Sequence, residues 1–336
     1  MPAAGKQPIT IYDVAGRAGV SIATVSRALR GSPAVAQATR DKVLAAVKEM
    51  RYRPSRLGQS LAVGQHAASG IVFPDLSGPY YAEVILGYEE VVAELGRSVL
   101  ILATHGRPHA ERKVLDLAGR VDGMVIMGRT VDDQVVEQVA AGGLPVVLLA
   151  RPPIGALDAV NADNDNSARQ LVAHLLAHGY RDFAYLGDPA ASPDVAGRYA
   201  GFRAALVEAG VPVPEPVACA FDVEAGHAAA RGLLAGSPPP RALVCANDEV
   251  ALGALRAAGE LGIAVPERLA VTGWDDVMAA RYAPLTTVRQ PMRELGAVAA
   301  GWLLERARGS DSAVRRRTLG SQLVVRSSCG RHNGAA

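Results

Sequence analysis

The stretch from Thr10 to Leu29, TIYDVAGRAGVSIATVSRAL, predicts two short helices joined by a tight turn. Gly19 supplies the left-handed backbone that such a turn needs. Thr10, with Asp13 three residues later, and Ser21 predict the N-caps of the two helices, because their side chains can satisfy open backbone amides. Apolar residues at helical spacing would pack the helices together: Val14, Ala18, Val20, Val25 and Ala28. This pattern is typical of a helix-turn-helix unit that binds DNA.

The second of these helices would present its outer side chains to the major groove of DNA. Hydroxyl groups and a guanidinium can reach phosphates and guanine edges there. We expect DNA contacts in this unit from Thr10, Tyr12, Ser21, Ile22, Ala23, Thr24, Ser26 and Arg27. The alternative is a small helical hairpin that binds no nucleic acid, and the charge distribution opposes it.

The positive charge of the chain is concentrated near its N-terminus. Residues 1–66 hold ten lysines and arginines against three acidic residues, a formal charge of +7, which leaves −5 for the rest of a chain whose total is +2. Such a basic segment favours binding to phosphates, with an affinity that falls as salt rises. Val43, Leu44, Val47 and Met50 predict a third helix, and Ala36 stands where a capping Ser or Thr is usual.

From Ile9 to about Ser328 the chain resembles the lactose/galactose repressor family, chiefly through IYDVAGRAGVSIATVSRAL and YRPSRLGQSLAVG. The resemblance implies a DNA-binding head at 8–53 and a hinge at 54–66, whose short helix forms when two subunits meet on DNA. That helix would run from Pro54 or Ser55 to about Ala62, and on its own it should be largely unfolded. Leu61 would enter the minor groove, or it could instead anchor the linker on the body. The implied hinge contacts with DNA are Ser55, Arg56, Gln59, Leu61 and Ala62.

After Ala67, apolar strands alternate with helices rich in Ala and Leu, which is typical of parallel βαβ units. Strands are predicted at 70–74, 98–103, 123–127, 145–149, 183–187, 242–245 and 270–273, and helices near 81–95, 131–141, 167–178, 197–208, 224–234, 248–261 and 293–308. The predicted fold is therefore a small all-α helix-turn-helix head plus an α/β body. The resemblance implies that the body, 67–328, has two lobes of the periplasmic-binding-protein type with parallel sheets. These lobes would comprise about 67–160 with 289–310, and about 161–288 with 311–328.

Ligands of open parallel sheets bind beyond the C-terminal ends of the strands, where loops converge. The loops 75–81, 188–198, 247–249 and 274–276 follow predicted strands. The resemblance implies a small effector between the lobes, a sugar or related metabolite, although the family also contains nucleobase sensors. The effector contacts that it implies are Asp75, Tyr80, Tyr81, Met127, Arg151, Arg198, Phe221, Asn247, Asp275 and Gln290. Plainer roles stay open: Asn247 and Asp275 as cap or turn residues, Arg198 as a surface helix residue, and the aromatic residues as core.

Enzymatic motifs are missing from the sequence. No GxGxxG follows a predicted strand, and there is neither a Walker A motif nor HExxH. Three cysteines without metal spacing, no apolar leader and no run of about eighteen apolar residues predict a cytoplasmic protein without metal, cofactor or membrane contact. We expect a homodimer that binds a pseudo-palindromic operator in double-stranded DNA with an affinity set by the effector. The alternative is a metabolite-binding protein or sugar-modifying enzyme with an accessory helical head.

Overall fold

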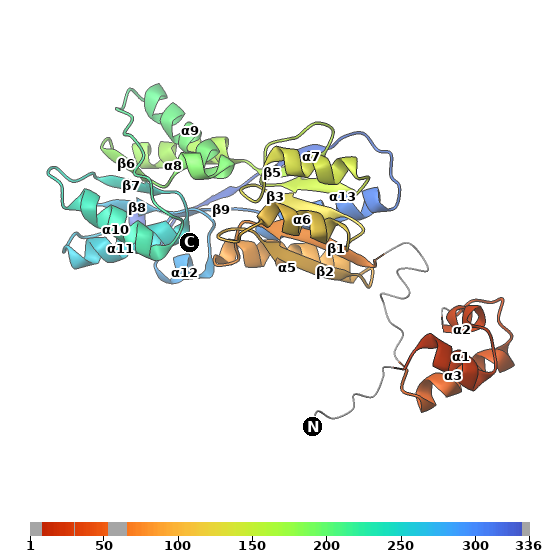
Figure 1. Ribbon diagram of the computed structural model, residues 1–336. Coiled ribbons are helices and arrows are strands. Elements are labelled where there is room, and N and C mark those ends of the chain that lie inside the picture. The colour runs from red at the N-terminus through yellow and green to blue at the C-terminus, as the bar shows by residue number, and fades with distance from the viewer. Residues whose placement is uncertain (1–8, 30, 53–65, 331–336) are drawn as a thin grey trace. The chain divides into compact units, whose positions relative to one another are not determined.

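The computed structural model describes residues 9–29, 31–52 and 66–330. It divides into two compact units, residues 1–67 and 68–336, which we call the head and the body (Figure 1). Each unit has a hydrophobic core of its own. The predicted hinge contacts Ser55, Arg56, Gln59, Leu61 and Ala62 lie outside the described residues, so the hinge stays a prediction.

The head is a bundle of the helices α1 (Ile11–Ala18), α2 (Ile22–Leu29) and α3 (Gln37–Glu49). Both predicted N-caps are confirmed: the Thr10 amide donates to Asp13 Oδ2 over 2.7 Å, and the Thr24 amide donates to Ser21 Oγ over 3.2 Å. Gly19 ends α1 with a φ of +66°, in the left-handed region. Helix α3 begins after Ala36 without a side-chain cap, as expected. The buried core is Val14, Ala15, Val25, Ala28, Val35, Val43 and Ala46, whereas Leu44 is exposed.

The first lobe of the body contains a six-stranded parallel sheet in the order β10-β5-β4-β3-β1-β2. Its strands are β1 (Ala68–Phe73), β2 (Ser98–Ala103), β3 (Met124–Met127), β4 (Val146–Leu149), β5 (Asp158–Ala162) and β10 (Arg316–Leu319). Helices α5 (Pro79–Ala93) and α13 (Met292–Ala307) pack on one face of this sheet. Helices α6 (Ala110–Ala118) and α7 (Asp133–Ala141) pack on the other.

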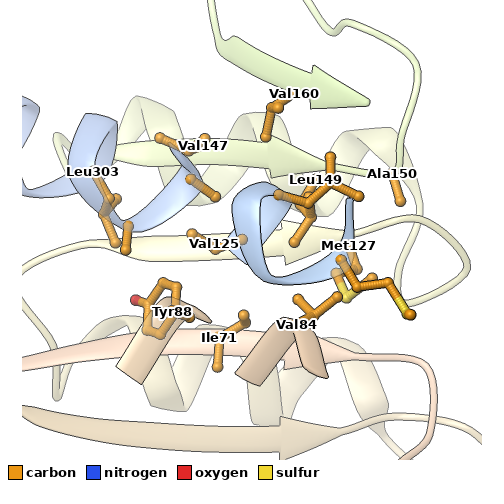
Figure 2. Close-up of a cluster of buried hydrophobic side chains, with 14 of the residues drawn as sticks. Ile71, Val84, Tyr88, Val125, Met127, Val147, Leu149, Ala150, Val160 and Leu303 are labelled. Carbon is orange, nitrogen blue, oxygen red and sulfur yellow. The ribbon is translucent and has the colours of Figure 1, made fainter. Parts of the chain in front are cut away.

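The core between the sheet, α5 and α13 fixes the position of α5, whose N-terminus reaches the candidate pocket. Figure 2 shows its side chains, among them Ile71, Val84, Tyr88, Val125, Met127, Val147, Leu149, Ala150, Val160 and Leu303. The two helices approach closely because each carries a glycine at the contact. A Cβ added to Gly87 would lie 2.0 Å from the Arg293 carbonyl oxygen, and one added to Gly296 would lie 2.1 Å from that of Val84.

The second lobe repeats this plan around a three-stranded parallel sheet in the order β6-β7-β8. These strands are β6 (Phe183–Leu186), β7 (Ala242–Cys245) and β8 (Ala270–Thr272). Helices α8 (Asn164–Ala177) and α9 (Pro193–Glu208) share one core with the sheet, and α10 (Val223–Leu234) and α11 (Asp248–Glu260) share the other. The remaining elements are η1 (Pro189–Ala191), α12 (Met278–Tyr282), η2 (Ser327–Cys329) and the antiparallel pair β9 (Thr287–Arg289) and β11 (Gln322–Val324). Figure 1 shows the two lobes side by side.

The structure corrects the predicted division of the lobes. The resemblance implies that residues 311–328 belong to the second lobe, but β10 pairs with β5 in the sheet of the first, with Arg316 opposite Ala159. Strand β10 is an edge strand of the first lobe, and β11 and η2 join the second. The sequence around Gly320 reads as one alternating run of residues, so it does not show that the chain crosses there from the first lobe to the second. Strand β5 and helix α6 were not predicted, because each offers only a short apolar pattern.

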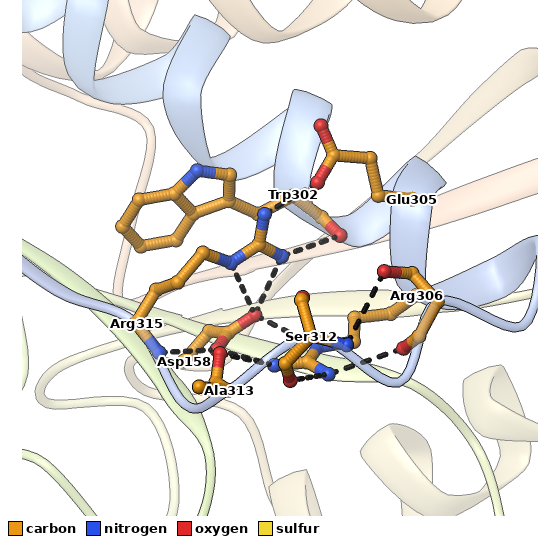
Figure 3. A network of polar contacts seen from close by, with 8 residues as sticks. Asp158, Trp302, Glu305, Arg306, Ser312, Ala313 and Arg315 are labelled. Carbon is orange, nitrogen blue, oxygen red and sulfur yellow. Dashed lines mark hydrogen bonds and ion pairs between the residues drawn. The ribbon is translucent and has the colours of Figure 1, made fainter.

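A buried carboxylate, Asp158, ties the start of β5 to α13 and to the segment before β10 (Figure 3). Arg306 Nη2 donates to Asp158 Oδ1 over 2.9 Å, and Arg315 Nη2 donates to Asp158 Oδ2 over 2.8 Å. The Arg315 guanidinium also lies 4.7 Å from the centre of the Trp302 ring. Burial alone would raise the pKa of Asp158, but the hydrogen bonds from the two arginines outweigh it and lower the pKa to about 2.

Candidate DNA-binding surface and effector pocket

The head presents most of its predicted DNA contacts to solvent. Tyr12 and Ile22 are 70% and 38% exposed. No described residue pairs with the exposed Arg27, whereas the neighbouring cation Arg17 is held by Glu49 at 2.8 Å. Of the other predicted contacts, Thr10, Ser21 and Ala23 are exposed, and Thr24 and Ser26 are half-buried. The DNA-facing role of the individual residues stays a prediction.

The body contains a pocket where loops of the two lobes meet at the C-terminal ends of the strands, as the parallel topology predicts. The first lobe contributes residues that follow β1 and β3, and the second contributes residues that follow β6, β7 and β8. The cavity encloses about 610 Å³, part of it open to solvent. It is lined by Asp75, Ser77, Gly78, Tyr80, Tyr81, Arg129, Ser192, Asp194, Val195, Arg198, Phe221, Asn247, Glu249 and Asp275.

Arg198, on the inward face of α9, is buried in the wall of this pocket. Its Nε donates to Asn164 Oδ1 over 2.9 Å, and its Nη1 donates to the Ala246 carbonyl oxygen over 2.6 Å. The guanidinium lies 4.7 Å from the centre of the Trp274 ring. These contacts fix the side chain in one orientation, so Arg198 is a rigid part of the pocket and not a surface helix residue.

Asp275 follows β8, is 4% exposed and has a φ of +110°, in the left-handed region. Gln290, which is itself buried, donates from Nε2 to Asp275 Oδ1 over 2.5 Å. Burial raises the pKa of Asp275 well above its usual range, although the nearby Arg198 opposes the shift. Gln290 therefore holds the Asp275 carboxyl group through this hydrogen bond and does not line the pocket itself.

The aromatic side of the pocket comes from both lobes. Tyr80 and Tyr81 lie in the first turn of α5 with their rings perpendicular and 5.3 Å apart. Phe221 lies in the second lobe, before α10, and the Arg129 guanidinium of the first lobe lies 4.8 Å from the centre of its ring. Burial, with Asp194 and Asp275 nearby, raises the pKa of Tyr80 well above its usual range, so its hydroxyl stays protonated.

Asp75 and Asn247 line the pocket, but each also serves the local backbone. Asp75 Oδ1 accepts from the Ser77 amide over 2.9 Å, which shapes the loop before α5. Asn247 Oδ1 accepts from the Val250 amide over 2.9 Å as the N-cap of α11, and its Nδ2 donates to the Phe221 carbonyl oxygen over 3.2 Å. The cap role considered for Asn247 is thus real, and it coexists with a place in the pocket wall.

Met127 and Arg151, two of the predicted effector contacts, do not line the pocket. Met127 is 2% exposed and belongs to the core under α5 and α13 (Figure 2). Arg151 is buried against α7, where its Nη2 donates to Asp133 Oδ1 over 2.5 Å and to the Val131 carbonyl oxygen over 2.7 Å. It borders a second, more open cavity instead. Met127 ends β3 and Arg151 follows β4, but neither side chain lines the pocket.

Sequence reasoning missed several residues of the wall, chiefly Arg129, Asp194 and Glu249. Asp194 and Glu249 lie within the loops 188–198 and 247–249 that the topology selects, so the signal was present but did not single them out. Asp194 accepts from Asn164 Nδ2 over 2.9 Å, and burial raises its pKa. Burial also raises the pKa of Glu249. Arg129 follows β3 directly after Gly128 and carries no pattern of its own.

Two further observations bear on the class of the protein. Within the ranges that the structure describes, no three His, Cys, Asp or Glu side chains are arranged to hold a metal. In the same ranges, no helix combines the length and apolar character needed to cross a bilayer.

Comparison with known proteins gives matches to both units. Residues 10–55 match the model of bacterial regulatory proteins of the lacI family, and residues 172–329 match that of the periplasmic binding protein-like domain. The HTH-type transcriptional regulator DegA of Bacillus subtilis (strain 168) is 34% identical over 329 residues, 95% of this chain and 97% of that protein. The lac repressor dimer bound to operator and the anti-inducer ONPF gives a TM-score of 0.87 at 30% identity, over 97% of this chain and 100% of that one. The structure of the transcriptional regulator CelR in complex with cellobiose gives a TM-score of 0.74 at 32% identity, over 95% of this chain and 99% of that one.

The fold and these relatives define a DNA-binding transcriptional regulator with a helix-turn-helix head and an effector-binding body, and not an enzyme. The chain belongs to the lacI family of bacterial regulatory proteins. The predicted family, fold class and general function are thereby confirmed.

Proposed function

We propose that this protein represses transcription in the cytoplasm as a homodimer on a pseudo-palindromic operator, and that a sugar or related metabolite in the pocket changes its affinity for DNA. The observation that supports effector binding is made in the pocket. Two of its wall residues, Tyr80 and Glu249, each have a buried side-chain oxygen that finds no partner among the described residues. Buried polar atoms without partners cost free energy, and a hydroxyl-rich ligand would supply the missing hydrogen bonds.

The named relatives support the two binding activities separately. One similar structure is a lac repressor dimer on its operator with an anti-inducer, and another is a CelR complex with cellobiose. For this chain, a single head reads few base pairs, so a dimer that presents two heads to a two-fold-related site would supply the specificity.

The route from ligand to DNA runs through the relative arrangement of the two lobes. The pocket wall comes from both lobes, so a ligand that contacts both favours the arrangement in which its contacts are complete. Coupling then requires that the effector binds this arrangement and the DNA-bound state of the dimer with different affinities. The effector shifts DNA affinity by no more than its own difference in affinity for the two states.

The test is a gel-shift measurement with full-length protein on genomic fragments at two salt concentrations. Arg27→Ala should weaken operator binding about tenfold or more while effector affinity stays intact, because the substitution removes from the DNA-facing surface a cation that pairs with no described residue. Arg198→Ala should abolish the effector response and leave operator binding intact, with Arg198→Lys as a milder second variant. Arg169→Ala, on a surface ion pair of α8, is the matched control.

Two results would contradict the proposal. The first is full-length protein that prefers no genomic fragment over random DNA. The second is an effector response that survives both substitutions of Arg198.

A further inference from the structure

We infer that the effector carries no anionic group: the pocket takes a hydroxyl-rich ligand that donates hydrogen bonds to Asp194, Glu249 and Asp275, and it rejects the phosphate ester of the same compound. This inference rests on the proposed function and narrows its ligand class. It also assigns a selective role to Asp194 and Glu249, which the sequence did not single out.

The described wall of the pocket is acidic. It contains the carboxyl groups of Asp75, Asp194, Glu249 and Asp275 against the guanidinium groups of Arg129 and Arg198. Burial raises the pKa of Asp194, Glu249 and Asp275, so the surroundings already disfavour negative charge. A phosphate ester would add between one and two further negative charges to this site. A neutral ligand avoids that repulsion.

The buried Arg198 is not arranged to receive a phosphate. Phosphate recognition by arginine commonly uses two parallel N–H groups on one edge of the guanidinium. Two nitrogens of Arg198 already donate to protein oxygens, Nε to Asn164 and Nη1 to Ala246, and its face covers Trp274. Arg129 is exposed, and its guanidinium lies 4.8 Å from the centre of the Phe221 ring, so the one arginine of the described wall with open N–H groups is a solvated one.

The helix N-termini around the pocket, which are natural anion sites, already face oxygens of the protein. At α5, Pro79 lacks an amide hydrogen, and Glu249 Oε1 lies 3.4 Å from where a Cβ would stand on Gly78. At α9, Asp194 occupies the first turn after Pro193. At α11, Asn247 caps the helix and Glu249 lies in the first turn. An incoming phosphate would meet a carboxylate or an amide oxygen at each of these positions.

The unpartnered atoms of the wall fit hydroxyl groups instead. Glu249 Oε2 and the Tyr80 hydroxyl are buried and have no hydrogen-bond partner among the described residues. Each hydroxyl group of a ligand can donate to the carboxylate oxygen and accept from the phenol. A polyol therefore satisfies both atoms, whereas a phosphate dianion has no proton to donate to Glu249.

The experiment compares D-ribose, D-glucose and cellobiose with the phosphate monoester of each. Thermal shift and calorimetry on the full-length protein give the affinities, and the gel shift gives the effect on operator binding. At least one neutral sugar should raise Tm and change operator binding, and its phosphate ester should bind at least about tenfold more weakly. An ester that binds as tightly as its parent sugar would overturn the inference, and so would a panel in which no neutral sugar binds.

Carboxylate variants test the assigned residues. Glu249→Gln and Asp194→Asn should each lower the affinity for the neutral sugar about tenfold. They should also reduce the ratio of the affinity for the sugar to the affinity for its phosphate ester, a change of selectivity that loss of folding cannot mimic. Glu260→Gln, at the exposed end of the same helix α11, is the control and should change neither value. If the ratio of the two affinities is the same in both variants as in the wild type, Glu249 and Asp194 do not select between sugar and ester.

The outcomes separate this inference from the proposed function. If a phosphate ester releases operator DNA from the wild type but not from Arg198→Ala, the effector mechanism stands and the ligand class inferred here is wrong. If operator binding responds to no member of the panel and Arg198→Ala behaves as the wild type, both are contradicted.

Discussion

Two sets of buried carboxylates in the body have opposite electrostatics. Asp158 accepts from two arginines, and its pKa is lowered to about 2 (Figure 3). In the pocket, burial raises the pKa of Asp194 and of Asp275, whose hydrogen-bond donors are the neutral amides of Asn164 and Gln290. The residue type is the same, and the difference lies in the partners that the fold supplies.

The comparison shows how one fold uses buried charge for two purposes. Where the partners are complete, as at Asp158, the carboxylate joins distant segments of the chain and stabilises the folded state. Where they are incomplete, as in the pocket, the folded state bears a cost that a ligand can relieve. Removing a carboxylate should therefore have opposite consequences for stability at the two places.

The largest effect is expected from Asp158→Asn. The substitution removes the buried carboxylate that Arg306 and Arg315 share. Arg315 keeps its ion pair with Glu305, but Arg306 loses its counter-charge in a largely buried position, so the free energy of unfolding should fall by about 3 kcal/mol. Urea unfolding of the full-length protein at neutral pH measures it. A loss well under about 1 kcal/mol would show that the two arginines find other partners at little cost.

The acid dependence of stability should come next in size. The folded pKa of Asp158, about 2, lies below its ordinary value of 3.8. Its contribution is therefore fully present above the ordinary value and is lost as the pH falls through about 2. The difference in unfolding free energy between the wild type and Asp158→Asn should shrink over this range. A difference that does not vary with pH would contradict the assigned cause.

A pocket substitution should show the reverse behaviour. Because burial raises the pKa of Asp275, its ionisation opposes folding, and stability falls as the pH rises above the usual carboxyl range. Asp275→Asn should keep the contact with Gln290 and should therefore unfold at pH 8 with an unchanged or higher Tm. Its effector response should be weaker. A clear drop in Tm would mean that Asp275 is structural in the way that Asp158 is.

The smallest effect is expected at an exposed ion pair. Asp165 pairs with Arg169 along α8 at 2.9 Å, with half of the Asp165 side chain exposed, so solvent screens the interaction. Asp165→Asn should leave the urea midpoint within error of the wild type. A shift of the urea midpoint as large as that of Asp158→Asn would show that burial does not explain the difference between the two ion pairs.

The sequence predicts the head and the general plan of the body well. Caps at Thr10 and Ser21 and the turn at Gly19 follow from local chemistry, which does not depend on distant residues. The parallel strands likewise place the loops 75–81, 188–198, 247–249 and 274–276 at one site, because strand direction decides where loops meet.

The direction of individual side chains could not be predicted in the same way. Met127 ends β3 and Arg151 follows β4, but Met127 faces a core and Arg151 pairs with Asp133. Asp194 and Glu249 look like ordinary first-turn acids, and only the approach of the other lobe turns Glu249 into a wall residue next to Gly78. The lobe that β10 joins depends on which sheet has an edge strand available for pairing, and this is known only once the fold is assembled.

The edge position of β10 also bears on how the protein is made. The first lobe is translated early, yet α13 and β10, which cover one face and one edge of its sheet, come from residues 292–319. The ribosome must therefore synthesise nearly the whole chain before this lobe can close over its apolar surface. The head, whose helices all lie before residue 50, needs no such wait. The part of the body that is translated first is thus among the last to be completed.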